Sequence, residues 1–156
     1  MIVLEKNKMN SLLTDISLQI KHRELRPVYE FAVREFRVPG SNARYVDTDI
    51  TTGKENLAQA IIMRLLTPKG EMASLGHPEY GSRLHELIGQ ANTATKYSLA
   101  KLYILESLGL ESRIEKITDL VVTKIQGTRD QVKIVITVKP KGETDVVKIG
   151  PFVLEL

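Results

Sequence analysis

The sequence contains no cysteine and no tryptophan among its 156 residues, and only 5% of the residues are aromatic. Without cysteine, disulfides, thiolate zinc ligands and cysteine nucleophiles are excluded. The longest strongly apolar run, residues 58–66, contains Gln59 and Arg64 and is far shorter than the roughly 20 residues of a membrane-spanning helix. Glu5 and Lys8 stand where a signal peptide needs an uninterrupted apolar segment. We therefore expect neither a membrane span nor a secretory signal peptide.

The net charge of +3 is unevenly distributed. Residues 1–46 hold eight Lys and Arg against five Asp and Glu, whereas the remainder holds equal numbers of each. Four aromatic residues stand among these basic residues: Tyr29, Phe31, Phe36 and Tyr45. Such a mixture suits nucleic-acid binding, but glutamates interrupt it and no nucleic-acid motif is present. We predict a solvated face and no nucleic-acid partner, with a basic adaptor for nucleic acid as an alternative.

The clearest helix signal begins at Thr52. Thr52-Gly53-Lys54-Glu55 has the spacing of a capping box, in which the Thr hydroxyl and the Glu carboxylate satisfy backbone donors of the first turn. Apolar residues then recur at helical spacing: Leu57, Ala58, Ile61, Ile62, Leu65 and Leu66. Pro68 cannot continue the helix. The pattern predicts a helix over about 53–67.

Two further helices are expected before residue 110. Ser82 can cap a short helix that carries Leu84, Leu87 and Ile88 on one side and ends at Gly89. Asn92 can cap a longer helix ending at Gly109. Its second half is apolar on more than one face: Leu99, Leu102, Tyr103, Ile104, Leu105 and Leu108. We predict that this helix is central and covered on several sides.

The C-terminal third has the period of β-strands. Residues 132–138 alternate Val, Ile, Ile and Val with more polar positions, which predicts a half-buried antiparallel strand. A strand over 119–126 precedes it and a run over 146–156 follows. Pro151 lacks a backbone donor and so belongs at a sheet edge or a bulge. The predicted arrangement is a three-stranded meander that ends on an exposed edge strand.

The predicted fold class is therefore α+β, with helices packed on a small antiparallel C-terminal sheet. Residues 47–156 form one domain, and residues 1–46 are an N-terminal extension. Within the extension, strand or loop pieces are expected around residues 16–20 and 28–38, broken by Pro27 and ended by Pro39-Gly40.

Few residues are arranged for catalysis or for cofactors. His77 and His85 have nearby glutamates, but His85-Glu86 lacks the second histidine that a zinc-protease helix needs, so no metal is expected. The glycines of residues 70–81 do not match a phosphate-binding loop, so no cofactor is expected either. Three glutamates could supply a glycosidase acid and its ionised partner: Glu71, Glu79 and Glu86.

Two segments carry a resemblance to a known family: Thr67-Pro68-Lys69-Gly70-Glu71 and Pro78-Glu79-Tyr80-Gly81-Ser82-Arg83-Leu84. Asp49-Ile50 and Asn56-Leu57 with Gln59 precede them, and a long helix and a three-stranded sheet follow. In this order the features resemble the baseplate wedge proteins of contractile injection machines. These machines include contractile-tailed phages, type VI secretion systems and extracellular contractile particles. The resemblance covers residues 47–156.

The resemblance implies three sets of site residues. The first is the family-motif turn: Thr67, Pro68, Gly70, Glu71, Tyr80, Gly81, Ser82 and Arg83. Pro68, Gly70 and Gly81 would set backbone geometry, while Glu79 and Arg83 would clamp the turn or face a partner. The second is Glu111-Ser112-Arg113, which matches a family Glu-Pro-Arg triplet that docks on the core bundle of the wedge. Serine stands where the family has proline, and the alternative is a local exposed ion pair.

The third set is the last strand, because the family's sheet is similar to the strand-exchange domain of sheath subunits. A sheath strand would add to this edge, whose residues include Val146, Val147, Ile149, Phe152, Val153 and Leu154. The alternative is an edge merely protected by Lys148 and Pro151.

The resemblance thus implies a structural protein and not an enzyme. Its expected partners are other baseplate wedge proteins and sheath subunits, with tail-tube or hub proteins as further candidates. It would be assembled in the cytoplasm and reside in the baseplate of a phage tail or a contractile injection particle. Some members of the family carry a lysozyme label, so a lysozyme-like cell-wall hydrolase is the alternative.

Overall fold

The computed structural model describes residues 12–23, 26–37, 39–40, 42, 44–91, 93–128 and 131–155, with the backbone alone at residues 20–23, 26–29 and 45. The strands are β1 (Thr14–Ile16), β2 (Leu18–Arg23), β3 (Arg26–Phe31), β4 (Val33–Arg37), β5 (Arg44–Thr48), β6 (Ile50–Thr52), β7 (Ile114–Lys124), β8 (Gln131–Pro140) and β9 (Val147–Glu155). The helices are α1 (Gly53–Leu66) and α2 (Ala94–Gly109), with short 3₁₀ turns η1 (Ala73–Leu75) and η2 (Leu84–Leu87). The α+β fold class is confirmed.

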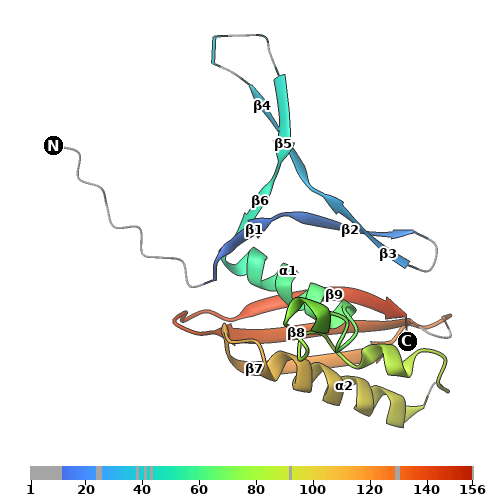
Figure 1. The fold of residues 1–156 in the computed structure, drawn as a ribbon. Helices are drawn as coiled ribbons and strands as arrows, with labels where there is room; N and C mark the ends of the chain where they lie inside the picture. Colours follow the sequence, from blue (N-terminus) through green and yellow to red (C-terminus); the bar gives the residue numbers. More distant parts are fainter. Residues whose placement is uncertain are drawn as a thin grey trace. The chain divides into compact units, whose positions relative to one another are not determined.

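The C-terminal sheet is the predicted antiparallel meander in the order β7-β8-β9 (Figure 1). The alternating residues of β8 are all buried: Val132, Ile134, Ile136 and Val138. Each such side chain contributes about 1.5–3 kcal/mol of burial energy, so the central strand is a main source of stability. β7 begins at Ile114 and not at Asp119, because residues 114–118 pair with the end of β8 through two register shifts.

β9 is an edge strand, as predicted, and Pro151 lies in a bulge. Ile134 pairs with Phe152 and Ile136 pairs with Ile149, so β9 has one more residue than β8 between these two pairs. A proline at this point removes no hydrogen bond from a regular ladder. Leu156, the last residue of the predicted strand, lies outside the described residues.

α1 occupies the residues that the capping-box signal and Pro68 delimit. Leu57, Ile61 and Leu65 are buried at four-residue spacing, which confirms the predicted apolar stripe. At the C-terminal end, the backbone N–H and the hydroxyl of Thr67 both donate to the Met63 carbonyl, at 3.0 and 2.8 Å. The chain then leaves the helix at Pro68.

α2 differs from the prediction in two respects. Its cap is Thr93, whose hydroxyl accepts from the Lys96 backbone N–H at 3.3 Å; Asn92, the predicted cap, lies outside the described residues. The helix packs against β7 and η2, but one side is left open, because Leu102 and Leu105 are 55% and 43% exposed. Its apolar residues occupy more of the circumference than the sheet covers.

The predicted short helix is the 3₁₀ turn η2. Leu84 and Leu87 are buried as expected, whereas Ile88 is exposed. The backbone of Ile88 is extended, which turns its side chain away from the apolar side of the turn. The Ser82 hydroxyl accepts from the Leu84 backbone N–H at 3.3 Å, as a capping residue would.

The predicted N-terminal extension contains β-ribbons, although residues 1–11 lie outside the described part. Three two-stranded ribbons, β1–β6, β2–β3 and β4–β5, diverge from one point (Figure 1). There the backbones of Ser17, Ala32 and Asp49 form a closed cycle, in which each N–H donates to the carbonyl of another member at 2.7–2.9 Å. Pro27 does not break a strand; it pairs with His22 inside β3. The sequence had given no signal for β5 and β6.

Two polar side chains of α1 hold β1. The Asn56 side-chain amide donates to the Leu12 carbonyl at 2.8 Å and is buried. The Gln59 side chain donates to the Ile16 carbonyl and accepts from the Leu18 backbone N–H, both at 2.8 Å. Gln59 therefore hydrogen-bonds to β1 and β2 in the way a neighbouring strand would.

The chain divides into two compact units, Met1–Gln59 and Ala60–Leu156. The predicted domain boundary between residues 46 and 47 stays a prediction. None of the helices in the described part of the chain is long and apolar enough to cross a membrane.

Candidate docking site

The predicted family-motif turn is one structural unit in which two loop segments cross. The Ser82 backbone N–H donates to the Thr67 carbonyl, and the Lys69 N–H donates to the Ser82 carbonyl, both at 2.8 Å. These bonds form a single parallel bridge between Pro68 and Ser82. The Ser82 hydroxyl also donates to the Leu65 carbonyl at 2.6 Å. The end of α1 is thereby tied to the start of η2.

Gly81 is required by this crossing for a steric reason. Its φ is +106°, and a Cβ built on it would lie 2.6 Å from the Thr67 carbonyl oxygen and 2.7 Å from that of Pro68. Both neighbours are backbone atoms held by the bridge. Gly70 also has positive φ, +89°, but a Cβ there would meet no atom within 4 Å. Of the two motif glycines, only Gly81 therefore lies where another backbone segment, Thr67–Pro68, comes too close for a side chain.

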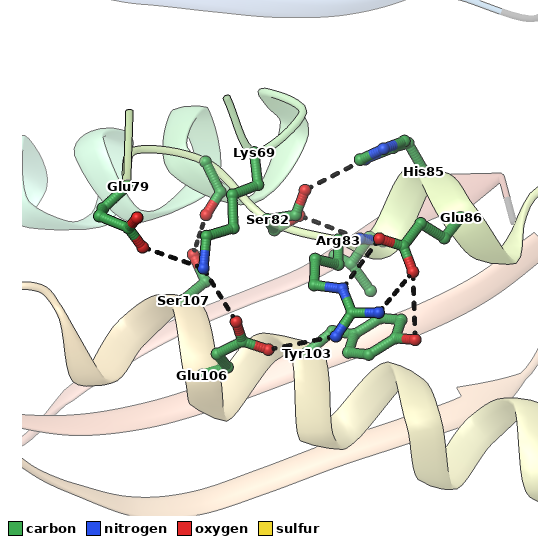
Figure 2. Close-up of polar contacts among 11 residues, drawn as sticks. Lys69, Glu79, Ser82, Arg83, His85, Glu86, Tyr103, Glu106 and Ser107 are labelled. Atoms are coloured by element: carbon green, nitrogen blue, oxygen red, sulfur yellow. Dashed lines mark hydrogen bonds and ion pairs between the residues drawn. The ribbon is translucent and has the colours of Figure 1, made fainter. Parts of the chain in front are cut away.

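α2 contributes a further bond that the sequence did not reveal. The Ser107 hydroxyl donates to the Gly81 carbonyl at 2.8 Å, and Ser107 is buried (Figure 2). A buried serine in a mostly apolar helix is the one signal that could have identified it, because a buried hydroxyl needs a partner.

Charged side chains form a chain of ion pairs over the turn (Figure 2). The Lys69 ammonium contacts Glu79 at 3.1 Å and Glu106 at 3.0 Å. Hydrogen bonds to Glu106 and then to Glu79 raise the pKa of Lys69. Arg83 is 3.9 Å from Glu106 and binds both carboxylate oxygens of Glu86 at 2.8 Å. The predicted clamp role of Glu79 and Arg83 thus has a geometric basis.

Arg83 also rests on α2. Its guanidinium lies 4.4 Å from the centre of the Tyr103 ring, and the Tyr103 hydroxyl is 3.3 Å from Glu86. The bidentate bond from Arg83 is the main reason why the pKa of Glu86 is lowered. His85 points to the Ser82 carbonyl at 3.1 Å, a local backbone contact. Glu71, the remaining residue of the predicted turn, is exposed.

The predicted docking triplet is largely turned inward. Glu111 and Arg113 expose only 6% and 17% of their side chains, whereas Ser112 is exposed. The Arg113 guanidinium donates to both carboxylate oxygens of Glu111, at 2.8 and 3.2 Å, and its backbone N–H donates to one of them at 3.3 Å. The alternative of a local ion pair agrees with this pairing, but the pair is mostly buried and not exposed, and it shapes the turn between α2 and β7.

Arg64 is the member of this cluster that the sequence did not identify. It lies 3.5 Å from Glu111, and the Tyr80 ring stacks 4.5 Å from its guanidinium. Burial raises the pKa of the Tyr80 hydroxyl. Burial alone would raise the pKa of Glu111, but the hydrogen bonds and charge of Arg113, together with the charge of Arg64, lower it overall. Glu111 is therefore held ionised between two arginines.

The predicted sheath-binding residues divide between the two faces of β9. Val147, Ile149 and Leu154 are buried, Phe152 and Val153 are half-buried, and Val146 is exposed just before the strand. In the described sheet, β9 pairs with β8 alone. Its other edge offers backbone groups, but half of its side chains belong to the core.

The surface beside the turn is nearly flat. A shallow hollow there contains about 170 Å³ of empty space, part of it open solvent. It is lined by Lys69, Gly81, Ser82, Arg83, Tyr103, Glu106, Ser107 and Leu110. It has no enclosed room for a water-sized molecule, so it is not a small-molecule pocket. No three His, Asp or Glu side chains gather as a metal site within the described ranges.

No protein-family model matches the chain, and no curated protein matches it. Its structure is similar to a crystal structure described as that of a "putative tail lysozyme" from Geobacter sulfurreducens, with a TM-score of 0.58. The two sequences are 20% identical, and the match covers 68% of this chain and 93% of the other. About two thirds of this chain therefore share the fold of that protein.

The crossing at Ser82 predicts unequal effects of two glycine substitutions. Gly81→Ala should destabilise the protein by about 3 kcal/mol or more, because a left-handed residue costs about 1–2 kcal/mol and the new Cβ also collides with backbone. Gly70 has open space around it, so Gly70→Ala should cost only the about 1–2 kcal/mol of the left-handed backbone conformation. Urea unfolding of the two variants measures the difference, and equal losses would show that the crossing is not tight.

The buried cluster predicts a pH-dependent contribution of Glu111. Because its pKa is lowered in the folded state, the stabilisation is present above the ordinary glutamate value of about 4.3 and is lost as the pH falls through the folded value. Glu111→Gln should cost about 1–3 kcal/mol at pH 7. The difference in free energy of unfolding between this variant and the parent protein should shrink below about pH 4. Denaturant unfolding between pH 3 and 7 tests this.

Glu71→Gln, which changes an exposed carboxylate of the same region, is the control. A Glu111→Gln loss that stayed constant with pH would contradict an ionised Glu111.

Proposed function

We propose that this protein is a structural component of a phage-type tail or contractile injection particle. More specifically, we propose a baseplate wedge protein that docks on the wedge core and provides the strand to which the first sheath ring attaches. The single observation on which the proposal rests is the set of ion pairs that the charged residues of the turn and of the triplet form. Arg83 holds Glu86, Lys69 holds Glu79 and Glu106, and Arg113 holds Glu111. Such a network fixes a surface shape.

The fold supports this setting. The structurally similar Geobacter sulfurreducens protein is described as a "putative tail lysozyme", and nearly all of it aligns with this chain. The resemblance of the turn and of the triplet to wedge proteins was found independently, from the sequence. Both observations favour a tail-associated, non-membrane setting, with assembly in the cytoplasm and a final place in the baseplate.

A surface next to the network could make the wedge contact. Leu102, Leu105 and Leu110 are each more than 40% exposed on or directly after α2. Ser112 follows them at the surface, while Glu111 and Arg113 hold the turn beneath it. Exposed apolar residues next to ordered polar residues are typical of protein interfaces, which have an apolar centre and a polar rim. In this proposal Glu111 and Arg113 position the docking surface, and α2 supplies its apolar part.

The sheath contact would use the free edge of β9. An added strand needs main-chain hydrogen bonds along an edge, and alternate side chains give specificity. The bulge at Gly150–Pro151 divides the edge into two short segments, 147–149 and 152–155. Such a division also limits unwanted pairing in the free protein.

We propose that the protein is not an enzyme. A glycosidase needs a carboxylic acid with a raised pKa, but the pKa of Glu86 is lowered by Arg83. Glu79 is 70% exposed and pairs with Lys69, and Glu71 is exposed in a loop. No observation at these positions favours the hydrolase alternative.

The α2 surface predicts the effect of two charged substitutions. Leu102→Asp with Leu105→Asp should leave the melting temperature within about 4 °C, because both side chains are exposed. Binding to co-expressed wedge proteins should fall below detection, since buried charges at an apolar contact are costly. Pull-down followed by electron microscopy measures assembly.

Leu75→Asp with Ile88→Asp is the control, because these residues lie outside α2 and are 67% and 64% exposed. Wedge assembly by the α2 variant at the level of this control would contradict docking through α2.

The free edge of β9 predicts different effects for proline substitutions at two neighbouring positions. In an antiparallel strand one residue directs its N–H toward the partner strand and the next directs it away. Of Phe152→Pro and Val153→Pro, we expect one to lower the melting temperature and the other to fold normally yet fail to assemble sheath. Truncation before Thr144 is a poorer test, because it removes Val147, Ile149 and Leu154 from the core. Sheath assembly by the folded variant would exclude strand addition at this edge.

A further inference from the structure

The point where the three N-terminal ribbons meet has a covered side and an open side. Ala32, one of the three residues of the backbone cycle, is buried, and the Asp49 side chain is 25% exposed. Side chains alternate along a strand, so the residues on either side of the cycle point the opposite way. Cross-strand partners there are Ile16–Ile50, Leu18–Phe31 and Val33–Thr48.

This open side is apolar and exposed. Ile16, Ile50, Phe31 and Val33 expose 45–64% of their surface. Val46, two residues further along the same face of the β4–β5 ribbon, is 63% exposed. We call these five residues, together with Arg37 and Arg44 at the end of that ribbon, the junction face. Two-stranded ribbons are marginal in isolation, and exposed apolar surface of this kind is usually covered by a partner.

The outer end of the junction face is positively charged. Arg37 and Arg44 are direct cross-strand partners, on the same face as Val33 and Val46. Like charges placed opposite one another destabilise a ribbon. Among the described residues, Arg44 has one ion pair, a long contact of 3.8 Å with Glu35, and both side chains are more than 60% exposed. Glu35 lies on the same face, opposite Val46, so the two arginines leave a net positive charge there.

The β4–β5 ribbon extends the junction face from the junction out to Arg37 and Arg44. Arg37 lies five residues beyond Ala32, which corresponds to about 17 Å of extended strand. Arg34 is fixed near the junction by a 2.7 Å ion pair with Asp49, so it does not add to the outer charge. A complementary partner therefore has an apolar contact that extends to Val46, with carboxylates beyond it that reach Arg37 and Arg44, up to about 17 Å of strand from the junction.

We propose that the junction face binds an acidic protein surface of the same particle, with the apolar residues at the centre and Arg37 and Arg44 on carboxylates at the rim. Arginine pairs recognise carboxylates by bidentate hydrogen bonds. The exposed aliphatic side chains favour a protein over nucleic acid, because Ile and Val offer neither base stacking nor phosphate contacts. This inference rests on the proposed tail function, but it concerns a contact separate from α2 and β9.

A photo-crosslinker placed on each face of the ribbons tests the proposal. Benzoylphenylalanine is substituted for Phe31, on the junction face, or for Phe36, whose position alternates to the other face of β4–β5. The full chain is co-expressed with the tube, wedge and sheath proteins of its particle, and the assembled particles are irradiated. Position 31 should crosslink to one of these proteins at a segment rich in Asp and Glu, and position 36 should not.

Charge variants give the second readout. Arg37→Glu with Arg44→Glu should lower the crosslink yield from position 31 about tenfold, because rim charge pairs become repulsive. Lysine substitutions at the crosslinked acidic segment should restore it. Lys124→Glu with Lys141→Glu makes the same change in net charge at exposed residues of the second unit and should have no effect. Circular dichroism confirms that each variant is folded.

The outcomes separate this inference from the proposed function. A chain that enters the particle but yields no crosslink from position 31, or equal crosslinks from positions 31 and 36, overturns the inference and leaves the proposed function standing. Crosslinks to a second copy of the chain or to nucleic acid also overturn it. A chain that never enters the particle overturns both.

Discussion

The structure of the second unit depends on the close backbone approach at Gly81. Because no Cβ intervenes, Ser82 can exchange hydrogen bonds with the chain at Thr67 and Lys69, and its hydroxyl can close the end of α1. Ser107 then fixes the same turn to α2. The turn that a short motif in the sequence marks is thus the point at which the two long helices are joined. Lys69 and Arg83, the two cations of the surface network, lie at or next to this crossing.

The two charged clusters beside the turn have different physical roles. The Arg64–Glu111–Arg113 cluster is mostly buried, so each charge needs its partners, and removing one would leave the others uncompensated. The Lys69–Arg83 network is at the surface, where a single pair is worth little but a connected set restricts several long side chains together. One cluster secures the α2–β7 turn, and the other fixes the shape of the surface around it.

The sequence predicted those parts of the fold that repeat a local pattern. The alternation in β8 and the four-residue spacing in α1 both identify which residues are buried, because burial there follows the period of the element. The covered sides of α2 were predicted wrongly, since apolar residues at Leu102 and Leu105 do not distinguish a core from an interface. Arg64 and Ser107 were missed because their partners are 47 and 26 residues away along the chain. Motif residues indicated the site, but only tertiary contact revealed that Glu111 and Arg113 face inward.

The N-terminal unit differs from the rest of the chain in that backbone hydrogen bonds hold it together with little buried core. Its ribbons satisfy their backbone groups through pairing and through the cycle of Ser17, Ala32 and Asp49, but they bury few side chains. Half of the large exposed apolar residues in the described chain lie between Leu13 and Ile50. A ribbon system with defined hydrogen bonds and little core gains most of its stability from whatever covers it. Because Arg37 and Arg44 lie on the same side as that apolar surface, they determine the charge of the partner that we propose for it.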